Sequence, residues 1–107
     1  MDNVLRNTLL YDYYGDLLTL KQKEIYHMYF CDDLSLAEIA DRFGTSRQAV
    51  NSSIKQAQRS FDAYEEVLGL VVRHVCAQEC LDKLRNSIES KNYTESIMML
   101  TKLEDLI

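Results

Sequence analysis

The chain has 107 residues, with 12 basic and 17 acidic side chains and a formal charge of −5 at pH 7. Its 47% hydrophobic content is normal for a folded protein, and its length allows a single modest core. These values exclude a disordered tail. No run approaches the roughly 20 apolar residues of a membrane span, and no N-terminal stretch resembles a signal peptide.

The chain has no proline and three glycines, so little in it interrupts long helices. We therefore expect an all-α protein of four to six helices without strands. Its three cysteines are an odd number without the spacing of a disulfide framework. This pattern indicates reduced thiols and a cytoplasmic location.

The first two predicted helices lie before residue 34. The first covers about residues 2–15, with stripes of Leu5, Leu9 and Tyr13 and of Leu10, Tyr14 and Leu17. Thr19 and Gln22 form a capping box that starts the second helix. Its expected inward residues are Leu20, Ile25, Met28 and Tyr29. The five tyrosines of these helices either pack the core or stack on bases and form an interface.

Residues 35–55, SLAEIADRFGTSRQAVNSSIK, have the spacing of a helix-turn-helix. Ala40 is small enough for two helices to cross, and Gly44 suits the left-handed turn between them. Ser35 with Glu38 starts a helix over about 36–43, and Ser46 starts the next helix near Arg47.

The second helix of this motif presents a polar face, because Val50 and Ile54 on its other side are expected to be buried. The candidate nucleic-acid-binding residues on this face are Ser46, Arg47, Gln48, Asn51, Ser52 and Lys55. Arginine can bind guanine, Gln48 and Asn51 can bind adenine, and Lys55 suits a phosphate. An ordinary solvated face has the same composition, so both interpretations stay open.

Charge argues against tight DNA binding by a lone monomer. Residues 35–60 have four basic and two acidic side chains, a formal charge of +2, whereas the other residues together have −7. Phosphate contacts supply most non-specific affinity, and they need a basic surface.

A heptad pattern continues from the motif toward the C-terminus and predicts an extended fourth helix. Its positions are Val50, Ile54, Ala57, Phe61, Tyr64, Leu68, Val71 and Val75. Such a seam lies on its own domain or also meets a second subunit, which would make a homodimer. Gly69 either ends this helix or is tolerated within it.

We expect two domains, a helix-turn-helix domain at 1–70 and a C-terminal helical hairpin at 71–107. The hairpin has two apolar stripes, Ala77, Leu81, Leu84 and Ile88 in one helix and Tyr93, Ile97, Leu100 and Leu103 in the other. Asn92 with Glu95 resembles a capping box at the start of the second helix. The hairpin either completes the core or forms a surface for a partner subunit or another protein.

The sequence offers no recognisable enzyme or metal site. His74, Cys76 and Cys80 lack evident third and fourth ligands, and helical cysteines usually behave as small core hydrophobes. It has no glycine-rich phosphate loop, no nucleophile with a plausible base and no paired carboxylates in an apolar pocket. We therefore expect no catalytic residue, metal or cofactor.

Several segments resemble region 4 of bacterial sigma factors and, more closely, the YlxM-like helix-turn-helix family. They are Leu18-Thr19, Lys21-Gln22, SLAEIADRFGTSRQAV at 35–50, the basic residues Lys55 and Arg59, and Asp62-Ala63-Tyr64-Glu65-Glu66. The string SRQAV, Ser46 to Val50, is shared with YlxM-like chains. Asn51, Ser52 and Ser53 depart from the tyrosine, aspartate and asparagine usual in that family.

The resemblance implies a sigma region 4-like helix-turn-helix bundle with a cytosolic regulatory or accessory role near the signal recognition particle. Two hypotheses follow from these observations. The first is a dimeric DNA-binding regulator that uses residues 46–55. The second is an accessory factor that contacts protein or RNA components of the signal recognition particle without binding DNA.

Overall fold

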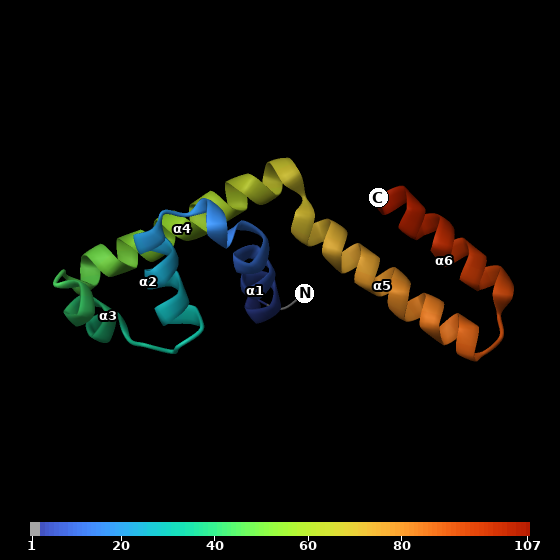
Figure 1. Ribbon diagram of the computed structural model, residues 1–107, viewed down its shortest axis with the longest axis horizontal. Coiled ribbons are helices and arrows are strands. Elements are labelled where there is room, and N and C mark those ends of the chain that lie inside the picture. The colour runs from blue at the N-terminus through green and yellow to red at the C-terminus, as the bar shows by residue number, and fades with distance from the viewer. Residues whose placement is uncertain (1–2) are drawn as a thin grey trace. The chain divides into compact units, whose positions relative to one another are not determined.

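The computed structural model describes residues 3–107, which divide into two compact units (Figure 1). The first unit ends at Leu68, and the second spans Gly69–Ile107. The residues described form helices and no strand, which confirms the expected all-α fold.

The first unit is a bundle built on one long helix. Its elements are α1 (Asn3–Tyr14), the short 3-10 helix η1 (Gly15–Leu17), α2 (Leu20–Phe30), α3 (Leu36–Phe43) and α4 (Arg47–Leu68). Helices α1, α2 and α3 each pack against α4 (Figure 1). Helix α4 therefore positions both the core and the helix-turn-helix.

Two predicted capping boxes are confirmed at helix starts. The Thr19 hydroxyl accepts a hydrogen bond from the Gln22 amide at 3.2 Å, and the Gln22 side chain accepts one from the Thr19 amide. Ser35 and Glu38 make the same reciprocal pair at 3.1 and 3.2 Å. Because these amides lack partners within the helix, the caps fix where α2 and α3 begin.

The core beneath the helix-turn-helix is a small aliphatic cluster. Its fully buried members are Ile25, Ile39, Ala40, Val50 and Ile54, from α2, α3 and α4. Burying each large aliphatic side chain contributes about 1.5–3 kcal/mol relative to leaving it exposed. This cluster holds α3 against the first half of α4.

The remaining part of the first unit has an aromatic core centred on Tyr26. The Tyr26 ring lies edge-on to Phe61 at 5.1 Å and stacks on Tyr11 at 5.4 Å. Tyr14 and Tyr26 are each 1% exposed, so these tyrosines pack the core. The alternative of base stacking does not apply to them.

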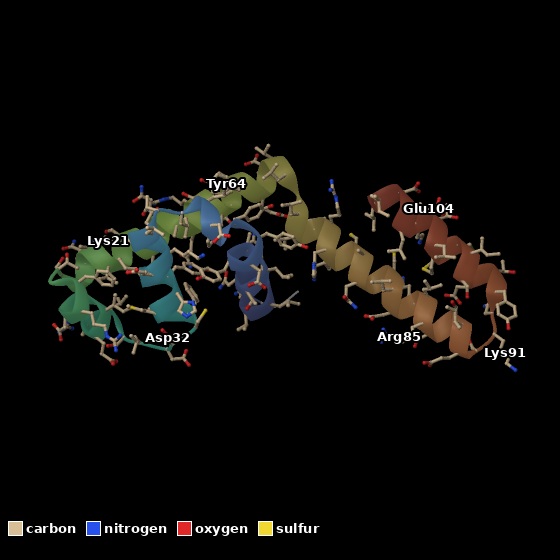
Figure 2. The ribbon with its side chains drawn as sticks, viewed as in Figure 1. Lys21, Asp32, Tyr64, Arg85, Lys91 and Glu104 are labelled. Atoms are coloured by element: carbon tan, nitrogen blue, oxygen red, sulfur yellow. The ribbon has the colours of Figure 1, made fainter. Side chains whose placement is uncertain are left out.

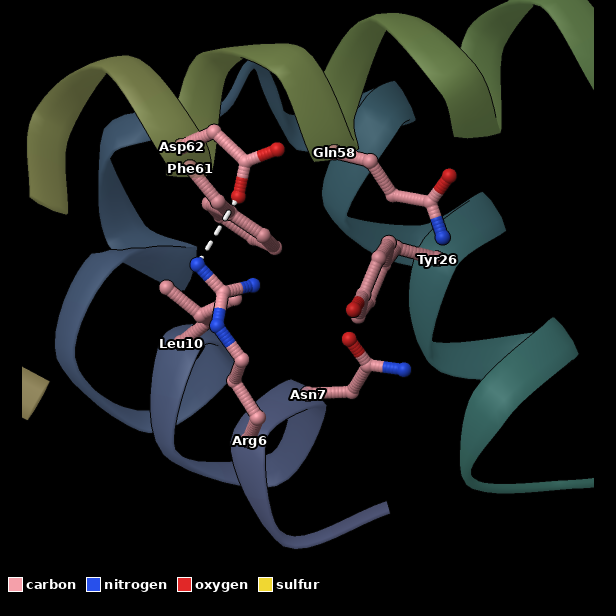
Figure 3. Close-up of a pocket in the computed structure, with 7 residues that line it drawn as sticks. All are labelled: Arg6, Asn7, Leu10, Tyr26, Gln58, Phe61 and Asp62. Carbon is pink, nitrogen blue, oxygen red and sulfur yellow. Dashed lines mark hydrogen bonds and ion pairs between the residues drawn. The ribbon is translucent and has the colours of Figure 1, made fainter. Parts of the chain in front are cut away.

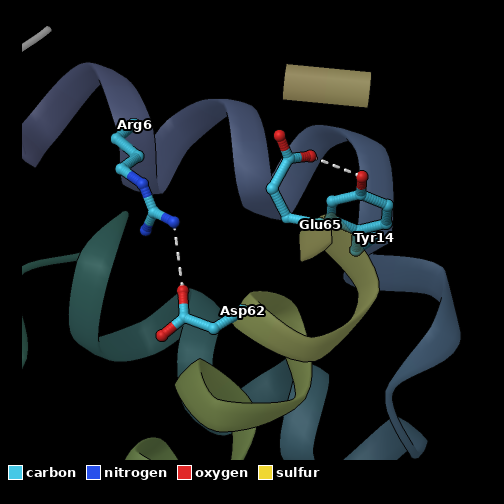
Figure 4. A network of polar contacts seen from close by, with 4 residues as sticks. All are labelled: Arg6, Tyr14, Asp62 and Glu65. Carbon is cyan, nitrogen blue, oxygen red and sulfur yellow. Dashed lines mark hydrogen bonds and ion pairs between the residues drawn. The ribbon is translucent and has the colours of Figure 1, made fainter. Parts of the chain in front are cut away.

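Polar contacts tie α1 to the second half of α4 (Figure 4). The Tyr14 hydroxyl donates to the Glu65 carboxylate at 2.6 Å, and the Arg6 guanidinium pairs with Asp62 at 3.2 Å. Asp62 and Glu65 are about one turn of α4 apart, so the two contacts hold α1 along one side of α4.

Some predicted inward residues of α1 and α2 are wrong. Leu20 and Tyr29, expected inward residues of α2, are 82% and 37% exposed, and Leu5, Tyr13 and Leu17 of the predicted stripes are 46%, 40% and 55% exposed. The buried face of α2 is formed by Ile25 and Tyr26, and five residues of helix place Leu20 about 140° from Ile25. In α1 the buried residues are Leu9, Leu10 and Tyr14, which turn Tyr13 toward solvent.

The heptad pattern is divided between two helices. Helix α4 ends at Leu68, and Gly69, with a left-handed φ of 62°, precedes α5 (Leu70–Glu89). The seam from Val50 through Phe61 is buried, whereas Leu68 is 48% exposed. Residues 50–61 therefore pack within the first unit.

The second unit is a hairpin in which α5 packs against α6 (Tyr93–Leu106). At the turn, Lys91 has a left-handed φ of 58° (Figure 2). The amide of Asn92 donates to the Ser87 carbonyl at 2.8 Å, and that of Lys91 donates to the Ile88 carbonyl at 3.0 Å. This is a Schellman motif, which satisfies the last carbonyls of α5.

The two helices of the hairpin meet through small and flexible residues. Ser87 and Ser96 share a hydrogen bond at 2.7 Å, and Met99 is 5% exposed. Much of the two apolar stripes lies outside this contact, since five of their residues are 45–64% exposed: Leu81, Ile88, Tyr93, Ile97 and Leu100. Serines allow a closer approach of the backbones than leucines would.

The start of α6 has only part of its expected capping box. The Asn92 side chain accepts from the Glu95 amide at 3.2 Å. The Glu95 carboxylate accepts from the Asn92 side chain at 3.4 Å rather than from the backbone amide. Asn92 nevertheless satisfies one of the first amides of α6.

Candidate nucleic-acid interface

The bend between α3 and α4 is a tight left-handed turn. Gly44 has φ 63° and ψ 38°, and its amide donates to the Asp41 carbonyl at 3.4 Å. The amide of Thr45 donates to the Ala40 carbonyl at 3.0 Å. These two bonds end α3 in a Schellman motif, so α4 starts after only two further residues.

Ser46 begins α4 as expected for an N-cap residue. Its hydroxyl accepts from the Ala49 amide at 3.1 Å, and its carbonyl accepts from the Val50 amide at 3.1 Å. The next amides, of Arg47 and Gln48, point out of the helix start without an intrahelical acceptor. Such amides favour an anion such as a phosphate.

The candidate contact residues lie on the surface of α4 opposite its buried side. Ser46, Arg47, Gln48, Ser52 and Lys55 are exposed, and Asn51 is half-buried. Val50 and Ile54, at 1% and 4% exposure, face the core. From Arg47 to Lys55 the helix rises about 12 Å, which is about the width of the DNA major groove.

The charged groups of this face are free to meet a ligand. The ion pairs among the residues described lie elsewhere, at Arg6–Asp62, Lys23–Asp16 and His27–Asp32. Arg59, one turn beyond Lys55, is also exposed and extends the basic row along α4. Asp41 and Glu38 on α3 are the nearest acidic residues along the motif and limit its positive charge.

Lys21, named above only for the family resemblance, is a basic residue that lies beside the motif. Its ammonium lies 5.9 Å from the centre of the Phe43 ring, at the end of α3. This cation–π contact places a cation of α2 next to the helix-turn-helix. The local sequence gives only a weak signal for it, because the contact joins residues 22 positions apart.

A separate pocket of about 170 Å³ lies between α1, α2 and α4 (Figure 3). It is lined by Arg6, Asn7, Leu10, Tyr26, Gln58, Phe61 and Asp62. The Tyr26 hydroxyl points toward Asn7 and has no hydrogen-bond partner among the residues described (Figure 3). Burial raises the pKa of Tyr26 to about 12, so this hydroxyl stays protonated at neutral pH.

The cysteines and the other side chains that could bind a metal do not form a metal site among residues 3–107. Cys31, Cys76 and Cys80 are free thiols, and burial is the main cause that raises the pKa of Cys31. Residues 3–107 contain no group of three or more histidine, cysteine or acidic residues placed to hold a metal. None of their helices is long and apolar enough to cross a membrane.

The fold and the α3–α4 geometry define a helix-turn-helix protein. The chain belongs to the UPF0122 family, whose description is "Putative helix-turn-helix protein, YlxM / p13 like" and whose model matches residues 1–101. This match confirms the resemblance drawn from the sequence.

Relatives within this family cover most or all of the chain. A UPF0122 protein of Thermoanaerobacter sp. (strain X514) is 49% identical over 88 residues, which are 82% of this chain and 75% of that protein. A UPF0122 protein of Halalkalibacterium halodurans is 36% identical over 107 residues, 100% of this chain and 98% of its own length. One from Symbiobacterium thermophilum is 39% identical over 103 residues, 96% of both chains.

Proposed function

We propose that this protein is a non-enzymatic, cytoplasmic regulatory factor that binds DNA through the exposed side of α4. The observation that supports this most is the placement of Arg47 and Lys55 on a face that its own unit leaves uncovered. The helix start at Ser46 offers amides to a phosphate, and Gln48, Asn51 and Ser52 are the side chains that we propose contact base edges.

In this proposal the protein binds DNA as a homodimer. One face holds only a few cations, and the first unit, residues 1–68, has seven basic and eleven acidic residues. A second copy doubles the basic surface, and two such faces about 34 Å apart would match successive major grooves. The dimer thus brings more basic contacts to one duplex than a single subunit does.

The test of DNA binding compares two double variants that lose the same charge. Arg47→Ala with Lys55→Ala changes the proposed face, and Lys83→Ala with Lys102→Ala changes exposed lysines of the hairpin. Binding to labelled genomic DNA fragments is measured by fluorescence anisotropy between 50 and 200 mM salt, a range in which phosphate contacts weaken strongly.

We expect the first variant to bind at least about tenfold more weakly and the second within about twofold of the wild type, since one base or phosphate contact is worth about 1–3 kcal/mol. An equal loss in both variants would show that overall charge, not this face, governs binding. Absence of binding by the wild type at 50 mM salt would reject DNA as the ligand.

A second candidate function is supported by the acidity outside the motif. Outside residues 35–60 the formal charge is −7, which suits a protein partner better than a DNA duplex. In this alternative the chain is an accessory factor that contacts protein or RNA of the signal recognition particle. Capture of that particle's protein or RNA by the wild type and equally by the Arg47/Lys55 variant, without any DNA shift, would favour it.

A further inference from the structure

One side of the α5–α6 hairpin is an apolar surface that no element of its own unit covers. Cys80 and Ser87 lie on the inner side of α5, and Ser96 and Met99 lie on the inner side of α6. Each is followed directly by an exposed apolar residue: Leu81, Ile88, Ile97 and Leu100. One residue of helix turns a side chain by about 100°.

These four apolar residues lie on the same side of the hairpin. The two helices run antiparallel, because a short turn at 90–92 joins them. A rotation of the same sense about two antiparallel helices leads to the same side of their common plane. Tyr93, at 64% exposure, and the half-buried Ala77 extend this surface, which we call the apolar hairpin face.

The opposite side of the hairpin is polar. The residues that directly precede Cys80, Ser87, Ser96 and Met99 lie there, and all but one are charged or amide side chains: Glu79, Asn86, Glu95 and Met98. Lys83 and Lys102, which precede the half-buried Leu84 and Leu103, lie on the same side. The hairpin is thus amphipathic as a whole, with one apolar and one charged side. Such a layer is stable in water when a second layer covers its apolar side.

The hairpin has too small an interior to hold its fold by itself. The second unit is Gly69–Ile107, and its buried side chains are Val71, Ser87, Ser96 and Met99. Units below about 40 residues usually need a disulfide, a metal or association with another chain. Its cysteines Cys76 and Cys80 are free thiols.

We propose that a second copy of this chain covers the apolar hairpin face, so that two hairpins form a four-helix bundle. The charge of the hairpin suits self-association, since residues 69–107 have five basic and six acidic side chains. The hairpin also has exposed charges of both signs, such as Arg85 on α5 and Glu104 on α6 (Figure 2). A nearly neutral apolar surface attracts its own copy without the repulsion that a strongly charged surface would add.

This inference names the surface through which the homodimer of the proposed function forms. The inference rests on the proposed function only for the homodimer, because the dimer is measured without nucleic acid. Failure to bind DNA therefore leaves it standing, and a monomer leaves open whether DNA binds to a single subunit.

The test uses neighbouring residues of α6 with similar exposure. Leu100, at 48%, belongs to the apolar hairpin face, and Met98, at 55%, lies on the charged side. The full-length wild type, Leu100→Glu and Met98→Glu are compared by sedimentation equilibrium at 5–100 micromolar. The chain mass is 12.5 kDa, and we expect twice that mass for the wild type and Met98→Glu. We expect a single chain mass for Leu100→Glu.

Folding and an alternative interface are controlled in the same series. Circular dichroism checks that each variant keeps its helices, and Leu81→Glu on α5 repeats the test should Leu100→Glu unfold. Leu68→Glu probes the exposed end of α4 as a competing interface. A monomeric wild type, equal dissociation by Met98→Glu, or dissociation by Leu68→Glu but by neither hairpin variant would overturn the proposal.

Discussion

At the scale of single residues, Tyr26 is the group whose environment differs most from that of a free side chain. It is 1% exposed, its ring contacts Tyr11, Phe30 and Phe61, and its hydroxyl has no partner among the residues described. A buried hydroxyl without a partner usually costs about 1–3 kcal/mol. The ring therefore stabilises the first unit, while the hydroxyl opposes it.

We predict that Tyr26→Phe does not destabilise the protein at pH 7 and that it flattens the loss of stability at high pH. The folded pKa of about 12 exceeds the ordinary value of 10.0, chiefly because burial disfavours the phenolate. Below pH 10 both states keep the proton, so this group adds no pH dependence. Between pH 10 and 12 the unfolded state loses its proton first, and the free energy of unfolding falls by up to about 3 kcal/mol.

Urea denaturation at pH 7, 10 and 11.5 measures this effect. Tyr29→Phe serves as the control, because that tyrosine is 37% exposed. Wild type and Tyr26→Phe with the same slope above pH 10, or a loss of more than about 1 kcal/mol at pH 7, would contradict the prediction.

The sequence predicted the exposed candidate contact residues of α4 more easily than the burial of Tyr26. Val50 and Ile54 identify the buried side of α4 by their spacing, and geometry then places Arg47, Gln48 and Lys55 on the exposed side. Tyr26 and Tyr29 are both tyrosines on α2, and their local sequences do not differ in a way that shows which one is buried. Only the packing of α2 against Phe61 of α4 decides it. Whether the exposed face binds DNA stays a prediction.

At the scale of elements, the helix-turn-helix depends on one left-handed residue. Gly44 has φ 63°, and a Cβ built at this position meets no atom within 4 Å. A side chain here would therefore meet no steric clash with neighbours and would oppose only the backbone conformation. The bend and the exposure of the α4 face both follow from this residue.

We predict that Gly44→Ala lowers the free energy of unfolding by about 1–2 kcal/mol, the cost of the left-handed conformation for a residue with a Cβ. Gly44→Asn is the matched variant, since asparagine tolerates this conformation better, and it should lose less. Chemical denaturation followed by circular dichroism measures both. Equal stability of the alanine variant and the wild type would show that the turn changes shape at little cost.

Helix starts were more predictable than helix contacts. Capping boxes such as Thr19–Gln22 and Ser35–Glu38 involve residues three apart, so the local sequence contains the whole signal. The contact between α5 and α6 follows another rule, because the small Ser87 and Ser96 bring the backbones together. An apolar stripe shows that a face will be covered, but not which element covers it.

At the scale of the whole molecule, the chain combines two units of different character. The first unit has an aliphatic cluster and an aromatic core, and Arg6–Asp62 and Tyr14–Glu65 join its helices α1 and α4. The second unit has the small interior described above and a large apolar face. Family membership, established over residues 1–101, includes most of both units.

The serine pair at the centre of the hairpin has a consequence for local unfolding. A hydroxyl–hydroxyl contact at 2.7 Å is directional, and it adds much less hydrophobic stabilisation than two buried leucines would. We predict that in dilute solution the backbone amides of α5 and α6 exchange with deuterium before those of α2 and α3, as measured by mass spectrometry. Raising the protein concentration should slow exchange in the hairpin alone, because dimer formation would stabilise its helices. The stability of the hairpin would then depend on protein concentration.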